Sequence, residues 1–288
     1  MRKFFAPILF CFSFLTASAQ QSPWNTVAPP GSPTYTDLKM AVKDAGVCYR
    51  LDLTGFDFFK DKKLLPKSAA LTNVMAFRIG NNNISKIPSV FLQMHSLVFF
   101  ESMGNPLTTL SDSLGMWSVL KFLELTDTRF DTLPEGIYGC TELLSINLAN
   151  NKDTLHITNG ISTLNTLSEL NIYSTVVAAL PDSFSTMKNL RTLTLYKAGL
   201  QKFPKQLCPM AQLQEVHLDS NNISRLPRSI SNMHGLTYLS LRGNKITHIT
   251  SSICFLTNLS TLDLRGNPID PYEIKCLQAL LPTCSILF

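Results

Sequence analysis

Histidines are the side chains of this chain whose charge can change near neutral pH. There are five of them: His95, His156, His217, His234 and His248. Only His217 lies in a segment with strand periodicity and an open-face position, and Glu215 and Asp219 flank it at a spacing of two residues. Because alternate residues of a strand share a face, both carboxylates would lie beside the imidazole. Such a set could make a pH-sensitive contact with a partner, although a solvated polar face is the simpler interpretation.

Catalytic motifs are absent from the sequence. It holds no G-x-S-x-G or H-E-x-x-H motif, no phosphate-binding loop and no nucleotide-binding glycine pattern. It also lacks a C-x-x-C pair and the cysteine and histidine spacing that is typical of a zinc site. We therefore expect a protein that is not an enzyme and that uses no cofactor and no metal.

A repeat that runs along most of the chain must position these side chains. The pattern L-x-x-L-x-L-x-x-N-x-L begins at Val74, Leu97, Leu120, Leu143, Leu167, Leu190, Leu213, Leu236 and Leu259. The step between units is 23 residues, with a single step of 24, and a degenerate earlier unit begins at Cys48. A period of this length with this leucine spacing is typical of a solenoid.

Each unit predicts a short strand followed by a turn. In residues 213–223, Val216 and Leu218 lie two apart, so they share one face and the residues between them point the other way. Asn221 follows at the turn, where its amide can bond main-chain groups. Ala198 stands at the corresponding position of the preceding unit, which predicts a looser turn there. Stacked units can cover one another's leucines and pair their strands into one parallel sheet, which a single unit cannot do.

These features resemble the leucine-rich repeat family, specifically the 23-residue subclass with an L-P-x-x-I tail, of the exported bacterial type. The resemblance covers about residues 48–288, with about ten units over residues 48–270. It implies an α/β solenoid: a right-handed curved superhelix with one parallel sheet on the concave face. The convex face would carry short helical or extended segments, and helical caps would close both ends. The resemblance is almost silent on function, because the same coil serves receptors, adhesins, inhibitors and scaffolds.

The ends of the chain lie outside the repeat. Residues 1–19 have the charged start, apolar run and small-x-small cleavage site of a signal peptide. Residues 20–33 are expected to be a flexible leader, and residues 34–47 an N-terminal cap helix. Residues 271–288 are expected to be a C-terminal cap, with Asp270 as the N-cap of its helix. The protein should therefore be exported to the periplasm, the cell surface or the medium, without a transmembrane segment.

The charge of the chain is mild. The net charge is +5, and removing Arg2 and Lys3 with the signal peptide leaves 23 basic and 20 acidic side chains, or +3. No run of lysines and arginines occurs. A nucleic-acid partner is therefore not expected.

The cysteines leave two interpretations open. After the signal peptide they are Cys48, Cys140, Cys208, Cys254, Cys276 and Cys284. Cys208 and Cys254 occupy the same position two coils apart, which is beyond the reach of a disulfide. Disulfides Cys254–Cys276 and Cys276–Cys284 would satisfy the spacing. The alternative is that the thiols are reduced and fill apolar slots of the core.

Binding is expected at the strand positions whose side chains do not point into the core, because these side chains form one continuous concave surface. An aromatic and acidic patch stands out near the N-terminal third, a tyrosine pair in the middle and an arginine pair near the C-terminal end. The predicted binding residues are Phe99, Glu101, Met103, Phe122, Glu124, Tyr173, Tyr196, His217, Tyr238, Arg242 and Arg265. Exposed aromatic columns are typical of interface hot spots. An aromatic side chain on a sheet can instead merely support its cross-strand neighbour.

Two functions of different classes fit these features. The first is an exported, monomeric interaction module that binds a protein or peptide ligand on its concave face. The second is an adhesin that binds a glycan or the cell envelope, with Tyr173 and Tyr196 stacking on sugar rings. The sequence does not name the partner in either case.

Overall fold

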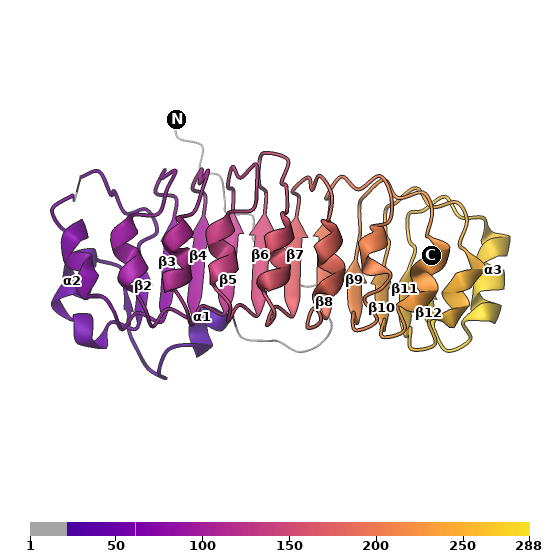
Figure 1. Ribbon diagram of the computed structural model, residues 1–288, viewed down its shortest axis with the longest axis horizontal. Helices are drawn as coiled ribbons and strands as arrows, with labels where there is room; N and C mark the ends of the chain where they lie inside the picture. The colour runs from indigo at the N-terminus through magenta and orange to yellow at the C-terminus, as the bar shows by residue number, and fades with distance from the viewer. Residues whose placement is uncertain (1–21, 61) are drawn as a thin grey trace, which may run out of the picture.

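The computed structural model describes residues 22–60 and 62–288, which form a solenoid built on one sheet (Figure 1). The predicted signal peptide lies outside the described residues. Each strand pairs in parallel with the strands before and after it in the chain. The strands are β1 (Thr34–Tyr35), β2 (Arg50–Asp52), β3 (Ala76–Gly80), β4 (Phe99–Met103), β5 (Phe122–Thr126), β6 (Ser145–Ala149), β7 (Glu169–Tyr173), β8 (Thr192–Tyr196), β9 (Glu215–His217), β10 (Tyr238–Ser240), β11 (Thr261–Asp263) and β12 (Ser285–Leu287). Strand order equals chain order, as expected for a coil that advances by one strand per turn.

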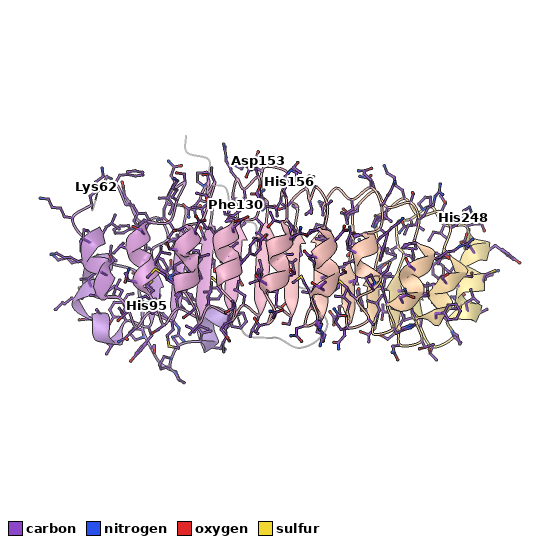
Figure 2. All side chains as sticks on the ribbon, viewed as in Figure 1. Lys62, His95, Phe130, Asp153, His156 and His248 are labelled. Atoms are coloured by element: carbon purple, nitrogen blue, oxygen red, sulfur yellow. The ribbon has the colours of Figure 1, made fainter. Side chains whose placement is uncertain are left out.

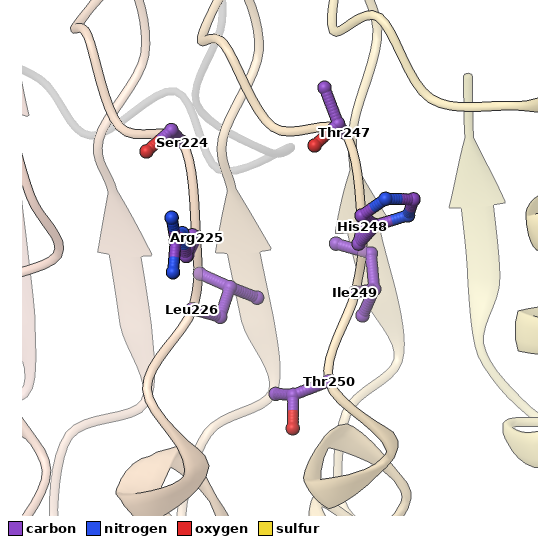
Figure 3. A pocket seen from close by; sticks show the side chains of 7 residues that line it. All are labelled: Ser224, Arg225, Leu226, Thr247, His248, Ile249 and Thr250. Carbon is purple, nitrogen blue, oxygen red and sulfur yellow. The ribbon is translucent and has the colours of Figure 1, made fainter.

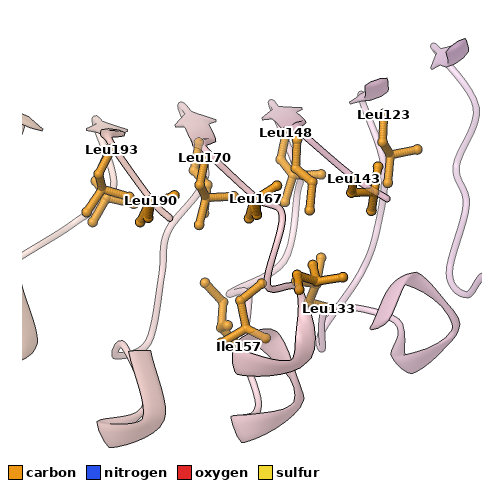
Figure 4. Close-up of a cluster of buried hydrophobic side chains, with 14 of the residues drawn as sticks. Leu123, Leu133, Leu143, Leu148, Ile157, Leu167, Leu170, Leu190 and Leu193 are labelled. Carbon is orange, nitrogen blue, oxygen red and sulfur yellow. The ribbon is translucent and has the colours of Figure 1, made fainter. Parts of the chain in front are cut away.

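Short 3-10 helices form the layer opposite the sheet. They are η1 (Ala45–Val47), η2 (Leu65–Ala70), η3 (Ser89–Gln93), η4 (Asp112–Met116), η5 (Glu135–Gly139), η6 (Asn159–Thr163), η7 (Asp182–Thr186), η8 (Lys205–Leu207), η9 (Arg228–Asn232) and η10 (Ser251–Phe255). Leucines such as Leu143, Leu167 and Leu190 lie between the two layers and are fully buried (Figure 4). One core cluster runs from Leu38 to Leu281, because each layer of leucines is covered by the next coil.

The register of the sheet reproduces the sequence period. Glu101 pairs with Glu124, and Glu124 pairs with Asn147, each 23 residues further on. Within β5, Leu123 and Leu125 are buried, while the residues that alternate with them are only partly buried. The surface formed by these alternating, non-core side chains is called the open face below. It is the face on which the sequence predicts binding.

A column of asparagines closes the turns after the strands. The side-chain Oδ1 of Asn221 accepts hydrogen bonds from the backbone N–H of Ala198 (3.0 Å) and Leu200 (3.1 Å). Its Nδ2 donates to the carbonyls of Leu195 (2.8 Å) and Leu218 (2.9 Å). Asn244 makes the same kind of bond to the coil before it, with the N–H of Ile223 (3.0 Å), so these bonds belong to every regular turn. At Ala198 the backbone carbonyl accepts from the N–H of Val177 (3.0 Å), and a looser turn there stays a prediction.

The N-terminal end differs from the expected cap helix over residues 34–47. Residues 34–35 form β1, an edge strand of the sheet. Helix α2 (Leu38–Lys43) begins only after Asp37, whose carboxylate accepts a hydrogen bond from the N–H of Met40 (2.8 Å). A side-chain N-cap fixes the start of a helix, so the residues before it are free to extend the sheet.

The C-terminal end is closed by helix α3 (Pro271–Leu280), which β12 follows. The carboxylate of Asp270 accepts a hydrogen bond from the N–H of Tyr272 (2.7 Å), as the sequence predicts for an N-cap. Ile274 and Leu277 are buried against the last coil. Among the described residues, no helix combines the length and the apolar character that crossing a membrane requires.

Every cysteine in residues 22–60 and 62–288 is a free thiol. Cys48, Cys140 and Cys208 are buried, and burial raises the pKa of the Cys140 thiol to about 12. Such thiols behave as small apolar side chains. Neither of the two disulfides considered from the sequence is present.

Candidate functional site on the open face

One row of side chains runs along the middle of the open face. From β5 to β11 it consists of Glu124, Asn147, Asn171, Thr194, His217, Ser240 and Asp263. Aromatic side chains flank this row, with Tyr173 and Tyr196 on one side and Phe122 and Tyr238 on the other. The residues between them fill the core, so these side chains pack among their open-face neighbours, where Asn171, Thr194, Ser240 and Asp263 are themselves buried.

Residues 22–33, called the strap below, cover the N-terminal end of this face. Helix α1 (Pro23–Thr26) lies in the strap, and Figure 1 shows it near β4 and away from α2. The Trp24 ring packs edge-to-face on Phe99 with ring centroids 6.0 Å apart. The guanidinium of Arg78 lies 4.0 Å from the centroid of the Trp24 ring. The described part of the predicted flexible leader is therefore ordered against the sheet.

The strap is tied down by Arg50, which is 9% exposed. Its Nε donates to the carbonyl of Trp24 (3.2 Å), and its Nη2 donates to the carbonyl of Asn25 (2.9 Å). Its Nη1 donates to the carbonyl of Ser32 (2.7 Å). One planar guanidinium thus satisfies three strap carbonyls, which its fork of donors allows.

The strap changes the aromatic patch that the sequence predicts. Phe99 is fully buried, so its assignment as an exposed hot spot is wrong. Phe122 is half-buried at the edge of the strap cluster, and Met103 is 39% exposed. Sequence reasoning missed Trp24, although a large aromatic side chain among prolines and polar residues is a signal that such a segment packs on something.

Glu101 and Glu124 are neighbours on the sheet but have different partners. Arg78 Nε donates to Glu101 Oε2 (2.7 Å). Burial, and next the charge of Glu101, raise the pKa of the Glu124 carboxyl to about 7, while Arg78 opposes this shift. A buried carboxylate beside a like charge is costly to ionise. The Glu124 carboxyl on the open face therefore titrates near neutral pH.

Replacing Glu124 by glutamine should stabilise the protein at high pH only. The pKa of about 7 lies above the ordinary value of 4.5, so ionisation weakens the fold as pH rises through that interval and costs most above pH 7. We expect Glu124→Gln to raise the free energy of unfolding by on the order of 2–3 kcal/mol at pH 8 and to leave it unchanged at pH 4. Urea unfolding at the two pH values measures the difference. Glu142→Gln, at an exposed position, is the control, and an equal effect of Glu124→Gln at both pH values would contradict the assignment.

Asn171 is the centre of a buried polar network and is 3% exposed. Its Nδ2 donates to Asn147 Oδ1 (2.8 Å) and to Glu169 Oε1 (2.6 Å). Asn147 in turn hydrogen-bonds Glu124. The Oδ1 atom of Asn171 is buried and has no hydrogen-bond partner within the protein. A buried acceptor of this kind is costly for the fold, so it calls for an explanation.

The tyrosine pair is brought together as the sequence suggests. The rings of Tyr173 and Tyr196 have centroids 6.5 Å apart and planes inclined at 50°. Burial raises the pKa of Tyr173, which also hydrogen-bonds Thr194. Lys197 Nζ lies 5.3 Å from the centroid of the Tyr196 ring, within reach of a cation–π contact.

His217 interacts electrostatically with both of its expected carboxylate neighbours, Glu215 and Asp219. Its Nε2 lies 3.7 Å from Glu215 Oε2, too far for a hydrogen bond, and the imidazole lowers the pKa of Glu215. The ring of Tyr238 covers the imidazole with centroids 4.9 Å apart. Nε2 is buried without a hydrogen-bond partner in the protein. Asp219 also accepts a hydrogen bond from the hydroxyl of Ser240.

The two arginines near the C-terminal end are exposed on adjacent coils but have different partners. Arg265 forms a bidentate pair with Asp263 of its own coil, with Nε to Oδ1 at 3.0 Å and Nη2 to Oδ2 at 2.5 Å. Arg242 is exposed, and its backbone N–H donates to Asp219 (2.8 Å). The carboxylate of Asp263 offsets the charge of the Arg265 guanidinium, although the Arg265 side chain remains 46% exposed.

The other histidines do not form a second site. Figure 2 shows His95, His156 and His248 well separated along the edges of the coil. His248 lines a hollow between the return segments of two successive units (Figure 3), with Ser224, Arg225, Leu226, Thr247, Ile249 and Thr250. Its Nδ1 lies 2.8 Å from Glu273 Oε2, so the imidazole already has a partner from α3. Within the described ranges, no group of three or more histidine, cysteine, aspartate and glutamate side chains could hold a metal ion.

The comparisons with known proteins agree with this fold. The family model of the leucine rich repeat matches residues 211–269. Together with the 12-stranded parallel sheet, this match shows that the chain has the leucine-rich repeat fold. No curated protein matches the sequence.

Several solved structures share the architecture. An internalin from Listeria monocytogenes is 18% identical, with a TM-score of 0.62, over 84% of this chain and 74% of its own. The leucine-rich repeat domain of the type III effector XopL is 18% identical, with a TM-score of 0.61, over 93% of this chain and 90% of its own. A structure of FLRT2 (LRR) with Latrophilin 3 and Unc5D gives 21% identity and a TM-score of 0.65 over 75% of this chain and 69% of the matched chain. At such identities the likeness shows the fold and does not transfer a partner.

Proposed function

We propose that this protein is an exported, non-enzymatic binding module that takes a protein or peptide ligand on the open face between β5 and β11. Two atoms of the open-face row carry the proposal: Asn171 Oδ1 and His217 Nε2 are buried polar atoms without hydrogen-bond partners in the protein. A ligand that supplies hydrogen bonds at this row would offset the cost of burying them. The tyrosines beside the row provide the aromatic contact area that interfaces use.

The strap supports a peptide as the ligand. It is itself a peptide segment on the same face, and it is bound through one aromatic ring and through carbonyls that accept from Arg50. Other proteins of this fold are also known in complexes. FLRT2 occurs with Latrophilin 3 and Unc5D, and the plant receptor RGFR1, of which this chain spans 45%, occurs with the peptide hormone RGF2.

A glycan is the second class of ligand, and the geometry favours it less. Sugar stacking on Tyr173 and Tyr196 would use ring faces that lie in a common plane, whereas these two planes are inclined at 50°. The carboxylates and amides of the row accept from N–H groups and from sugar hydroxyls alike, so the difference between the two classes of ligand lies in the rings.

Loss of the tyrosine pair should abolish most binding. Peptides selected from a displayed random library against this protein should bind at least about tenfold more weakly to the double variant Tyr173→Ala, Tyr196→Ala, because buried aromatic anchors dominate interface energies. Titration by fluorescence anisotropy measures the loss, and a thermal melt checks the fold. The matched control is Phe255→Ala, in η10 on the opposite layer, where the side chain is 60% exposed. A library without binders, or equal weakening by Phe255→Ala, would reject the site.

Export has its own expected result. Cleavage after Ala19 would leave Gln20 as the first residue of the exported chain. N-terminal sequencing of the protein from its natural source tests this, and an intact Met1 would overturn it.

A further inference from the structure

The open face between β5 and β7 has more hydrogen-bond acceptors than donors. Asn171 Nδ2 uses both of its hydrogens, one on Asn147 Oδ1 and one on Glu169 Oε1. Asn147 donates its own amide to Glu124. The network therefore ends in a carboxylate at each side, and the Oδ1 of Asn171 remains without a hydrogen-bond partner.

The chain's own cation on this side is already engaged. Arg78 acts on Glu124, but its Nε donates to Glu101 (2.7 Å) and its guanidinium lies over Trp24 (4.0 Å). The charges of Glu101 and Glu169 both disfavour ionisation of Glu124. A group that brings a positive charge and several N–H donors would satisfy what the network lacks.

We propose that Glu124, Asn171 and Glu169 form a subsite for the guanidinium group of an arginine side chain on a peptide ligand. This inference rests on the proposed function, because it names the chemistry that the ligand brings to the same face. Asn171 is 3% exposed, and its Oδ1 is the one buried acceptor of the cluster without a donor.

The spacing favours a guanidinium over a compact cation. Glu124 and Glu169 lie on β5 and β7, which at about 4.8 Å per strand are roughly 10 Å apart across β6. A divalent metal ion needs oxygen ligands that converge at 2.0–2.6 Å. A planar guanidinium instead presents five N–H donors in a fork and stacks on aromatic rings, and Tyr173 lies two residues from Asn171 on the same face.

The test uses single amino-acid probes, so that it does not depend on finding a peptide. We expect N-acetyl-arginine amide to cause saturable NMR shifts of the Asn147 and Asn171 side-chain amides. N-acetyl-citrulline amide, which has a similar shape without the charge, should cause none. The double variant Glu124→Gln, Glu169→Gln should weaken the arginine probe by at least about tenfold, since each removed carboxylate takes away a charge-assisted hydrogen bond. Glu142→Gln, on an exposed loop, should bind as the unmodified protein does.

The outcomes separate this inference from the proposed function. Absence of saturable shifts, equal shifts with citrulline, or an unaffected double variant would overturn the subsite. Equal binding of N-acetyl-lysine amide would overturn its assignment to guanidinium. If library peptides bind through Tyr173 and Tyr196 while the arginine probe fails, the subsite is wrong and the binding face stands. If the arginine probe binds but no library peptide does, the subsite stands and peptide binding is wrong.

Discussion

Replacing Asn221 by alanine is expected to lower the free energy of unfolding by about 3–5 kcal/mol. The side chain accepts from the N–H of Ala198 and Leu200 and donates to the carbonyls of Leu195 and Leu218. Each buried polar group left without a partner costs about 1–3 kcal/mol, and partial entry of water offsets some of the sum. Because Ala198 already lacks an amide, the variant would leave two successive coils without one.

Urea unfolding measures this effect. Asn222→Ala is the matched control, because Asn222 is the adjacent residue and its backbone N–H, which donates to Leu200 (2.8 Å), survives the change. Hydrogen exchange should show the loss of protection concentrated in β8 and β9, since a solenoid coil contacts only its neighbours. A loss as small as that of Asn222→Ala would mean that Asn221 does not hold the turn together.

Replacing Trp24 by alanine is expected to release the strap from the open face. The change removes a ring that packs on Phe99 and under the guanidinium of Arg78, at a cost of about 3 kcal/mol, as for other buried aromatic deletions. The cost falls on local opening of residues 22–33, because the leucine core does not include Trp24. Phe99 would then become exposed.

Hydrogen exchange of residues 22–33, together with binding of an apolar fluorescent dye, measures the release. Trp24→Phe is the control, since a smaller ring keeps an aromatic contact with Phe99 and should leave most of the protection in place. We expect a gain of dye binding in Trp24→Ala alone. Unchanged protection of the strap in that variant would show that the three hydrogen bonds of Arg50 are sufficient to hold it.

The strap also sets the extent of the binding face. It occupies β3 and β4, whereas the acceptor-rich network begins at Glu124 on β5. A ligand at the proposed subsite would therefore lie next to Trp24 and continue toward Tyr173 and Tyr196. The raised pKa of Glu124 means that an ionised carboxylate at this position lowers stability above neutral pH.

The sequence was sufficient for the architecture and for which side chains lie on the open face. The spacing of apolar residues such as Val216 and Leu218 selects a strand with one buried side, and the 23-residue period aligns equivalent residues on neighbouring strands. Both rules are local and repeat in every unit. They place Glu124, Tyr173 and His217 on the open face without any coordinates.

Only the tertiary structure decided which open-face side chains are already buried or paired within the protein. Phe99 is buried by Trp24, a residue 75 positions earlier, and Arg265 is paired with Asp263 through rotamers that no period specifies. The strap lies outside the repeat, so the repeat pattern does not predict which strands it packs against. Side-chain hydrogen bonds such as those of Asn171 depend on angstrom-scale geometry between strands. A periodic sequence determines the repeated strands and turns, because every unit carries the same spacing of apolar residues. A single side-chain contact between coils occurs only once, so no repeated sequence pattern predicts it.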